Sequence, residues 1–165
     1  MGWCDVAAKY SDKEIAQMIA ERKPLPEDYR SRVQLHNKRG HKERELDIVG
    51  ERNTEFRLIL RQSNFNTLDF SIILAVSPPD SSKLFRLRRY NGKHGEHTNR
   101  IEGTTFYNFH IHQATERYQE SGADEDTFAE PDGPLWRLPF GSTLHARRLW
   151  IRSTPEYPDI VLRGV

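Results

Sequence analysis

The sequence predicts an α+β fold: an N-terminal helix packs on a curved, mostly antiparallel sheet of five strands, and an irregular C-terminal arm follows. Three observations predict it. A helix-capping signal lies near the N-terminus, segments of alternating apolar and polar residues follow, and the connections between these segments are short. Short connections favour antiparallel neighbours, because parallel strands need long crossovers. A length of 165 residues suggests one domain, which we place at residues 1–130, with a tail over residues 131–165.

The helix is predicted to begin after Ser11. Ser11 and Glu14 form a capping box, in which each side chain satisfies an amide of the first turn. Ile15, Met18 and Ile19 follow at helical spacing, so one face is apolar and expected to pack on the sheet. A Lys-Pro step then ends the helix.

Alternation of apolar and polar residues predicts the strands. The third predicted strand is apolar on both faces, which favours a central position in the sheet. The five predicted strands are residues 44–51, 55–62, 68–76, 84–90 and 106–113. The apolar residues predicted to form the core are Ile15, Met18, Ile19, Phe56, Leu58, Leu60, Phe70, Ile72, Leu74, Phe85, Leu87, Phe109 and Ile111.

Composition limits the classes of function. The net charge of +1 argues against a bulk polycation, so any contact with nucleic acid must be local. Cys4 is the single cysteine, which excludes an internal disulfide and fits a reducing, cytoplasmic setting. No run of 18 apolar residues occurs, so we expect no membrane partner.

The stretch FYNFHIHQATERY carries the candidate chemistry. On a strand, residues two apart point to the same side, so His110 and His112 share one face. Tyr107, Phe109 and Ile111 share the other face, which is apolar and expected to enter the core.

One hypothesis is RNA cleavage without a metal. If the strands at 84–90 and 106–113 pair, Arg86 and Arg88 lie beside the two histidines, and Arg100 in the intervening loop adds a further cation. Arginine binds phosphate with a planar fork, and histidine transfers protons near neutral pH. The candidate catalytic residues are His110, His112, His94 and His97.

Two alternatives remain open. His110, His112 and Glu116 resemble the first motif of cupins, which would bind a divalent transition metal such as Fe, Mn, Ni or Zn. The neighbouring glycines, Gly103 and Gly122, each miss the cupin spacing by one residue. The other alternative is a module that binds RNA or protein without catalysis, in which the histidines only line a contact surface.

The run FRLRRYNGKHGEHTNRIEG, with FHIHQATERYQESG and FAEP after it, resembles an uncharacterised bacterial family filed as a domain of unknown function, over residues 3–131. A weaker likeness is to TumE-type toxins. It implies a RelE/ParE-like sheet, a role in a toxin–antitoxin or phage-defence system, an RNA target and a cognate antitoxin-like partner. The TumE likeness lies on Arg89, Tyr90, Asn91, His94, His97, His110 and His112. The RNA-binding residues are then predicted to be Arg86, Arg88, Arg89, Tyr90 and Arg100.

The tail differs in composition from the rest. Residues 131–165 hold no lysine, five arginines and five of the nine prolines, and the change begins where the resemblance stops. If the tail is back-translated into codons and these are read one nucleotide later, the new reading frame can encode an amphipathic helix. We therefore hypothesise that the tail is read in a shifted frame, which would leave apolar sheet surface uncovered and favour weak self-association.

Overall fold

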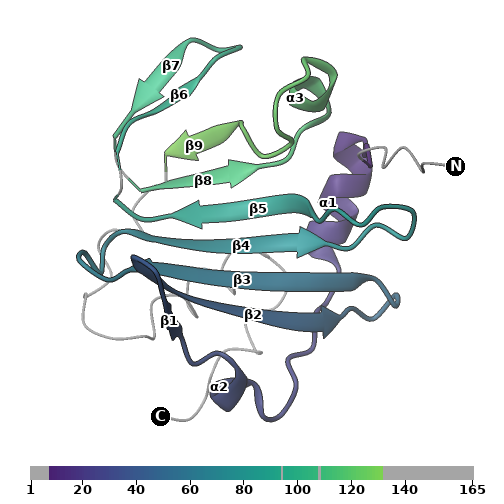
Figure 1. Cartoon of the computed structure of the whole chain (residues 1–165). Coiled ribbons are helices and arrows are strands. Elements are labelled where there is room, and N and C mark those ends of the chain that lie inside the picture. Colours follow the sequence, from purple (N-terminus) through teal and green to yellow (C-terminus); the bar gives the residue numbers. More distant parts are fainter. Residues whose placement is uncertain (1–7, 94, 108, 132–165) are drawn as a thin grey trace, which may run out of the picture. The chain divides into compact units, whose positions relative to one another are not determined.

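The computed structural model describes residues 8–93, 95–107 and 109–131 (Figure 1). The chain divides into two units after Pro131, and the described residues belong to the first unit. The frame-shift hypothesis concerns residues 132–165, which lie outside the described residues.

Antiparallel sheet is the main regular structure of the described residues. A seven-stranded sheet has the order β1-β2-β3-β4-β5-β8-β9, and β6 and β7 form a separate hairpin (Figure 1). Every strand from β1 to β5 pairs with its neighbour in sequence. The strands are β1 (His36–Lys38), β2 (His41–Val49), β3 (Glu55–Ser63), β4 (Phe70–Val76), β5 (Phe85–Asn91), β6 (His97–Asn99), β7 (Thr104–Phe106), β8 (His110–Gln113) and β9 (Ala129–Pro131).

The predicted five-strand sheet behind an N-terminal helix is therefore wrong. The main sheet has seven strands, and a second sheet of two strands accompanies it. Strands β1, β6, β7 and β9 have three residues each, which is too short for alternation to be recognised. The stretch from residue 106 to 113 is also divided between two sheets, because β7 ends at Phe106 and β8 begins at His110.

Helix α1 (Asp12–Ala20) begins as the sequence predicts. Ser11 and Glu14 form the capping box, with both reciprocal hydrogen bonds present. Ile15 is fully buried, and the ring of Tyr10 packs edge-on against Phe85 of β5 with a centroid distance of 4.8 Å. The helix therefore covers the sheet near β5. The other helices are short: α2 (Tyr29–Arg32) and α3 (Glu116–Glu120).

Helix α1 is also joined to α3. The backbone N–H of Tyr10 donates to Oε1 of Gln119 at 2.9 Å, and Nε2 of Gln119 donates back to the carbonyl of Tyr10 at 2.9 Å. The backbone N–H of Glu116 donates to Oδ1 of Asp12 at 2.8 Å. These hydrogen bonds thus join the first residue of α1 and the segment that leads into it to helix α3.

The core lies mainly on β3, β4 and β5. Strand β4 is buried on both faces from Ile72 to Val76, as expected for a central strand. The buried members of the predicted core are Ile15, Phe56, Leu58, Ile72, Leu74, Phe85 and Leu87. The other predicted core residues are half-buried: Met18, Ile19, Leu60, Phe70, Phe109 and Ile111. Within the described residues, no helix is long and apolar enough to cross a membrane.

The position of Ile72 gives a test of this core. Its side chain is 3% exposed in the central strand, so Ile72→Ala is expected to lower the free energy of unfolding by about 2–5 kcal/mol. Ile101→Ala is the control, because Ile101 is 50% exposed and its truncation is expected to cost less than about 0.5 kcal/mol. Urea unfolding of both variants measures the difference, and equal stabilities would place Ile72 outside the core.

Candidate metal centre

The pairing of β5 with β8 brings the two histidines of the His-x-His motif to the inner side of the sheet. In this register Arg89 lies opposite His112, and Asn91 lies opposite His110. Both histidines are 3% exposed. Both residues belong to β8, and their ring centroids lie 4.8 Å apart, so the two histidines share one face of the strand as predicted.

The burial of the two faces is the reverse of the expected arrangement. Tyr107 precedes β8 and is 62% exposed, while Phe109 and Ile111 are half-buried. The reason is that the β6–β7 hairpin places the rings of His97 and Phe106 against the histidine side of β8.

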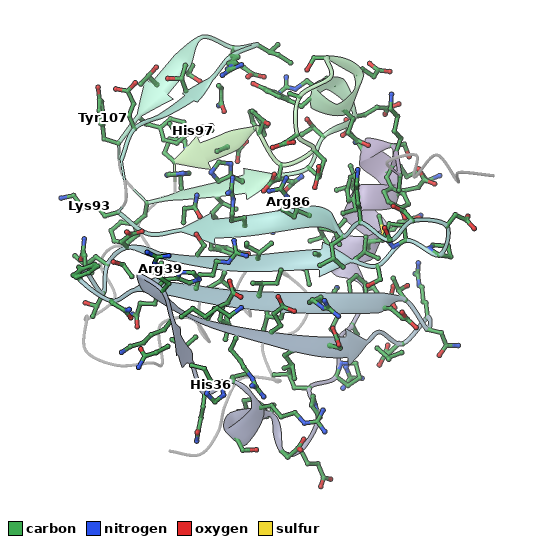
Figure 2. All side chains as sticks on the ribbon, in the orientation of Figure 1. His36, Arg39, Arg86, Lys93, His97 and Tyr107 are labelled. Atoms are coloured by element: carbon green, nitrogen blue, oxygen red, sulfur yellow. The ribbon has the colours of Figure 1, made fainter. Side chains whose placement is uncertain are left out.

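His97 completes a cluster of three imidazoles. Its ring centroid lies 5.3 Å from that of His110 and 4.6 Å from that of His112, and the latter two lie 4.8 Å apart. Phe106 packs against His97 and His110, at 5.4 Å from each. Figure 2 shows His97 near the open end of the hairpin, beside β9. Two separate sheets thus contribute to one site.

One nitrogen of each imidazole faces a common region. One nitrogen from each of the three histidines can serve as a metal ligand, and these three atoms all lie within 4.8 Å of one another. A tetrahedral zinc ion with Zn–N bonds of about 2.05 Å holds its ligand nitrogens about 3.3 Å apart. Each side chain would need to move inward by less than about 1 Å to reach that spacing.

Glu116, the third ligand of the cupin-like alternative, lies elsewhere. It is the first residue of α3, is exposed, and its Oε2 accepts from the backbone N–H of Asp12 at 3.4 Å. His97 is among the candidate residues of the sequence analysis, but the polar loop showed no periodicity from which its contact with His110 and His112 could be predicted. The available signal was local: a glycine, Gly103, lies between HTN and TTF, and in the structure it has the left-handed φ of +68° that a tight turn favours.

His112 has one nitrogen engaged and one without a partner. Nδ1 lies 2.8 Å from the backbone carbonyl oxygen of Asp126 and 3.2 Å from Nη2 of Arg89. The carbonyl only accepts and the guanidinium only donates, so Nδ1 cannot satisfy both. The shorter contact assigns the proton to Nδ1. Nε2 then carries a lone pair, and this buried atom has no hydrogen-bond partner among the described residues.

Burial holds His112 in its neutral form. Loss of hydration lowers its pKa to about 2, and the positive charge of Arg89 acts in the same direction. Metal binding requires a neutral imidazole, so this environment prepares His112 as a ligand.

His110 is connected to the interior of the sheet. Its Nε2 lies 3.3 Å from Nδ2 of Asn91, and Ser71 Oγ lies 2.8 Å from Oδ1 of the same amide. A hydroxyl both donates and accepts, so Ser71 supports either orientation of the Asn91 amide. In the flipped orientation Oδ1 accepts the proton of His110 Nε2.

Two of the predicted phosphate-binding arginines have acidic partners within the chain. Arg86 lies 3.1 Å from Glu125, 3.4 Å from Asp126 and 3.5 Å from Asp124. Arg89 lies 3.2 Å from Asp126, whose side chain is almost fully buried. The facing atoms, Nε of Arg89 and Oδ2 of Asp126, nevertheless lack a well-aligned hydrogen bond, so the pair is held by charge more than by geometry.

Three other predicted residues, all within the described part of the chain, do not join this cluster: Arg88, Tyr90 and Arg100. Nη2 of Arg88 donates to Oε1 of Gln113 on β8. Tyr90 is 2% exposed and lies opposite Ile72 and Ile111. Arg100 is exposed in the hairpin. His94 lies outside the described residues.

No family model, curated protein or solved structure matches this chain. The resemblance to the uncharacterised bacterial family and to TumE-type toxins therefore stays a prediction.

The lowered pKa of His112 predicts an acid-sensitive fold. Between about pH 6.5 and 2 the unfolded chain binds a proton that the folded chain does not, so stability falls as the pH falls through this window. Within this window, His112 is expected to lower the free energy of unfolding by up to about 1.4 kcal/mol for each pH unit of acidification. In chelator, urea unfolding of His112→Gln is expected to depend less on pH than that of the parent. His36→Gln, at an exposed position, serves as control and should keep the parental slope; an unchanged slope in His112→Gln would contradict the prediction.

Proposed function

We propose that this protein binds a divalent transition metal through His97, His110 and His112. The observation that carries the proposal is the buried Nε2 of His112, which has no partner among the described residues although it lies in a cluster of three imidazoles. A buried polar atom without a partner costs free energy. Coordination of a metal ion removes this cost.

The donor set supports ions of borderline character. Imidazole suits zinc, copper, iron and nickel, whereas magnesium and calcium prefer oxygen ligands. The Nδ1–H group of His112 also donates a hydrogen bond to the backbone carbonyl of Asp126, and such a bond is the usual support of a metal-binding histidine. These features favour a zinc-type or iron-type centre.

Three protein ligands are typical of catalytic centres, and four are typical of structural ones. An ion on three neutral imidazoles keeps its full positive charge and would act as a Lewis acid toward a small ligand in a remaining position. The role of the protein residues is to hold the three imidazoles together, with His110 and His112 each only 3% exposed.

The geometry gives less support to RNA cleavage by His110 and His112. A general acid must be protonated and must reach the leaving oxygen of the substrate. Both side chains are 3% exposed, and the pKa of His112 is lowered to about 2 by burial. Arg86 and Arg89 also have acidic partners within the chain. The RNA target and the antitoxin-like partner remain untested predictions.

Metal titration tests the proposal. The purified protein is stripped with a chelator and titrated with Zn²⁺ and with Co²⁺, whose visible absorption reports tetrahedral nitrogen coordination. We expect one ion per chain. When the concentration of free ion is about 100 times its dissociation constant, binding is expected to raise the free energy of unfolding by about 2.7 kcal/mol.

The variants decide which residues bind the ion. His97→Ala, His110→Ala and His112→Ala are each expected to weaken affinity by at least about 100-fold, because each removes a ligand. Glu116→Ala and the exposed His36→Ala are controls and should bind like the parent. A parent without stoichiometric binding, or a His97→Ala/His112→Ala variant with parental affinity, would refute the metal centre.

A further inference from the structure

Asn99 is the last residue of β6 and is buried, with 3% exposure. Every polar atom of its side-chain amide is engaged. Oδ1 accepts from the backbone N–H of Ala129 at 2.9 Å, and Nδ2 donates to the carbonyl of Ala129 at 2.7 Å. Nδ2 also lies 3.3 Å from the hydroxyl of Thr104, and Oδ1 lies 3.0 Å from Nε2 of His97. One amide thus connects the hairpin, β9 and a candidate ligand.

The orientation of this amide is determined by the backbone of Ala129. A backbone N–H only donates and a backbone carbonyl only accepts, so exchange of Oδ1 and Nδ2 would place donor against donor and acceptor against acceptor. Oδ1 therefore faces His97. An amide oxygen accepts only, so Nε2 of His97 carries the proton and Nδ1 carries the lone pair.

We propose that Asn99 is a positioning residue of the metal centre, which commits His97 to bind the ion through Nδ1 and fastens the β6–β7 hairpin to β9. This inference rests on the proposed metal-binding function. His112 is held in the opposite way, because its Nδ1 donates to Asp126 and its Nε2 remains available. The centre therefore combines an Nδ1 ligand with an Nε2 ligand.

Ala129 links the two halves of the site. It lies opposite His112 in the pairing of β8 with β9, and its backbone holds Asn99. The two hydrogen bonds of the amide imitate the ladder of a neighbouring strand, although β6 belongs to the other sheet. Asn99 consequently sets both the distance of His97 from His112 and the nitrogen that His97 presents.

The tip of the hairpin has a second, separate attachment. The hydroxyl of Tyr118 donates to Oε2 of Glu102 at 2.6 Å and accepts from the backbone N–H of Ile101 at 3.2 Å. Arg117 forms an ion pair with Glu102. A change at Glu102 therefore loosens the hairpin without touching the amide that faces His97, which provides a matched control.

The first measurement needs no variant. Nitrogen-15 chemical shifts of the imidazoles in the metal-free parent distinguish the two neutral forms of histidine. We expect His97 protonated at Nε2 and His112 protonated at Nδ1. A His97 protonated at Nδ1 would overturn the inference, whether or not the protein binds a metal.

The second measurement compares variants. Asn99→Ala is expected to weaken Zn²⁺ binding about 10–100-fold, as loss of a residue that orients a ligand does, and to abolish the preference of His97 for the Nε2 proton. Glu102→Ala should keep that preference and most of the affinity. If the parent binds no Zn²⁺, the proposed function fails while the nitrogen shifts still judge the role of Asn99. If the parent and Asn99→Ala bind Zn²⁺ equally, the inference fails while the metal centre stands.

Discussion

The pairing of β5 with β8 is the interaction on which the candidate metal centre depends. Its register sets Asn91 opposite His110 and Arg89 opposite His112, and in each pair the side chains are also in contact. A slip of one residue would turn every side chain of β8 to the other face of the sheet. The register of the backbone hydrogen bonds between β5 and β8 therefore also determines whether His110 and His112 face the cluster.

The histidine side of the sheet is a polar surface extended across several strands. In one row, Arg61 lies 2.6 Å from Glu43, and Asn91 bonds both Ser71 and His110. Glu43 is 7% exposed, and the hydrogen bond and charge of Lys38, with those of Arg61, hold its pKa at about 2 despite burial. The buried polar groups of this one row, which runs from Glu43 to His110, are tolerated because they have partners. The row therefore contributes more to the specificity of the fold than to its hydrophobic stability.

The sequence predicts those parts of the fold whose signals are local. The capping box of Ser11 and Glu14 needs four residues. Strands β2, β3 and β5 show alternation of apolar and polar residues directly, and β4 shows the apolar run of a central strand. The edge strands have too few residues for a period. Alternation also shows that His110 and His112 share a face, but not that this face is buried. Its burial depends on a hairpin whose contribution, through His97 and Asn99, comes from tertiary contacts that no local pattern contains.

The join between α1 and α3 has a consequence for the order of folding. Tyr10 and Asp12 find their partners 109 and 104 residues later, at Gln119 and Glu116, whereas β2 to β5 pair with their immediate neighbours. Closing a long loop costs chain entropy before its contacts repay it. On the ribosome the sheet can therefore begin to pair while α1 still lacks these partners. Helix α1 is thus synthesised first but is among the last elements to form its tertiary hydrogen bonds.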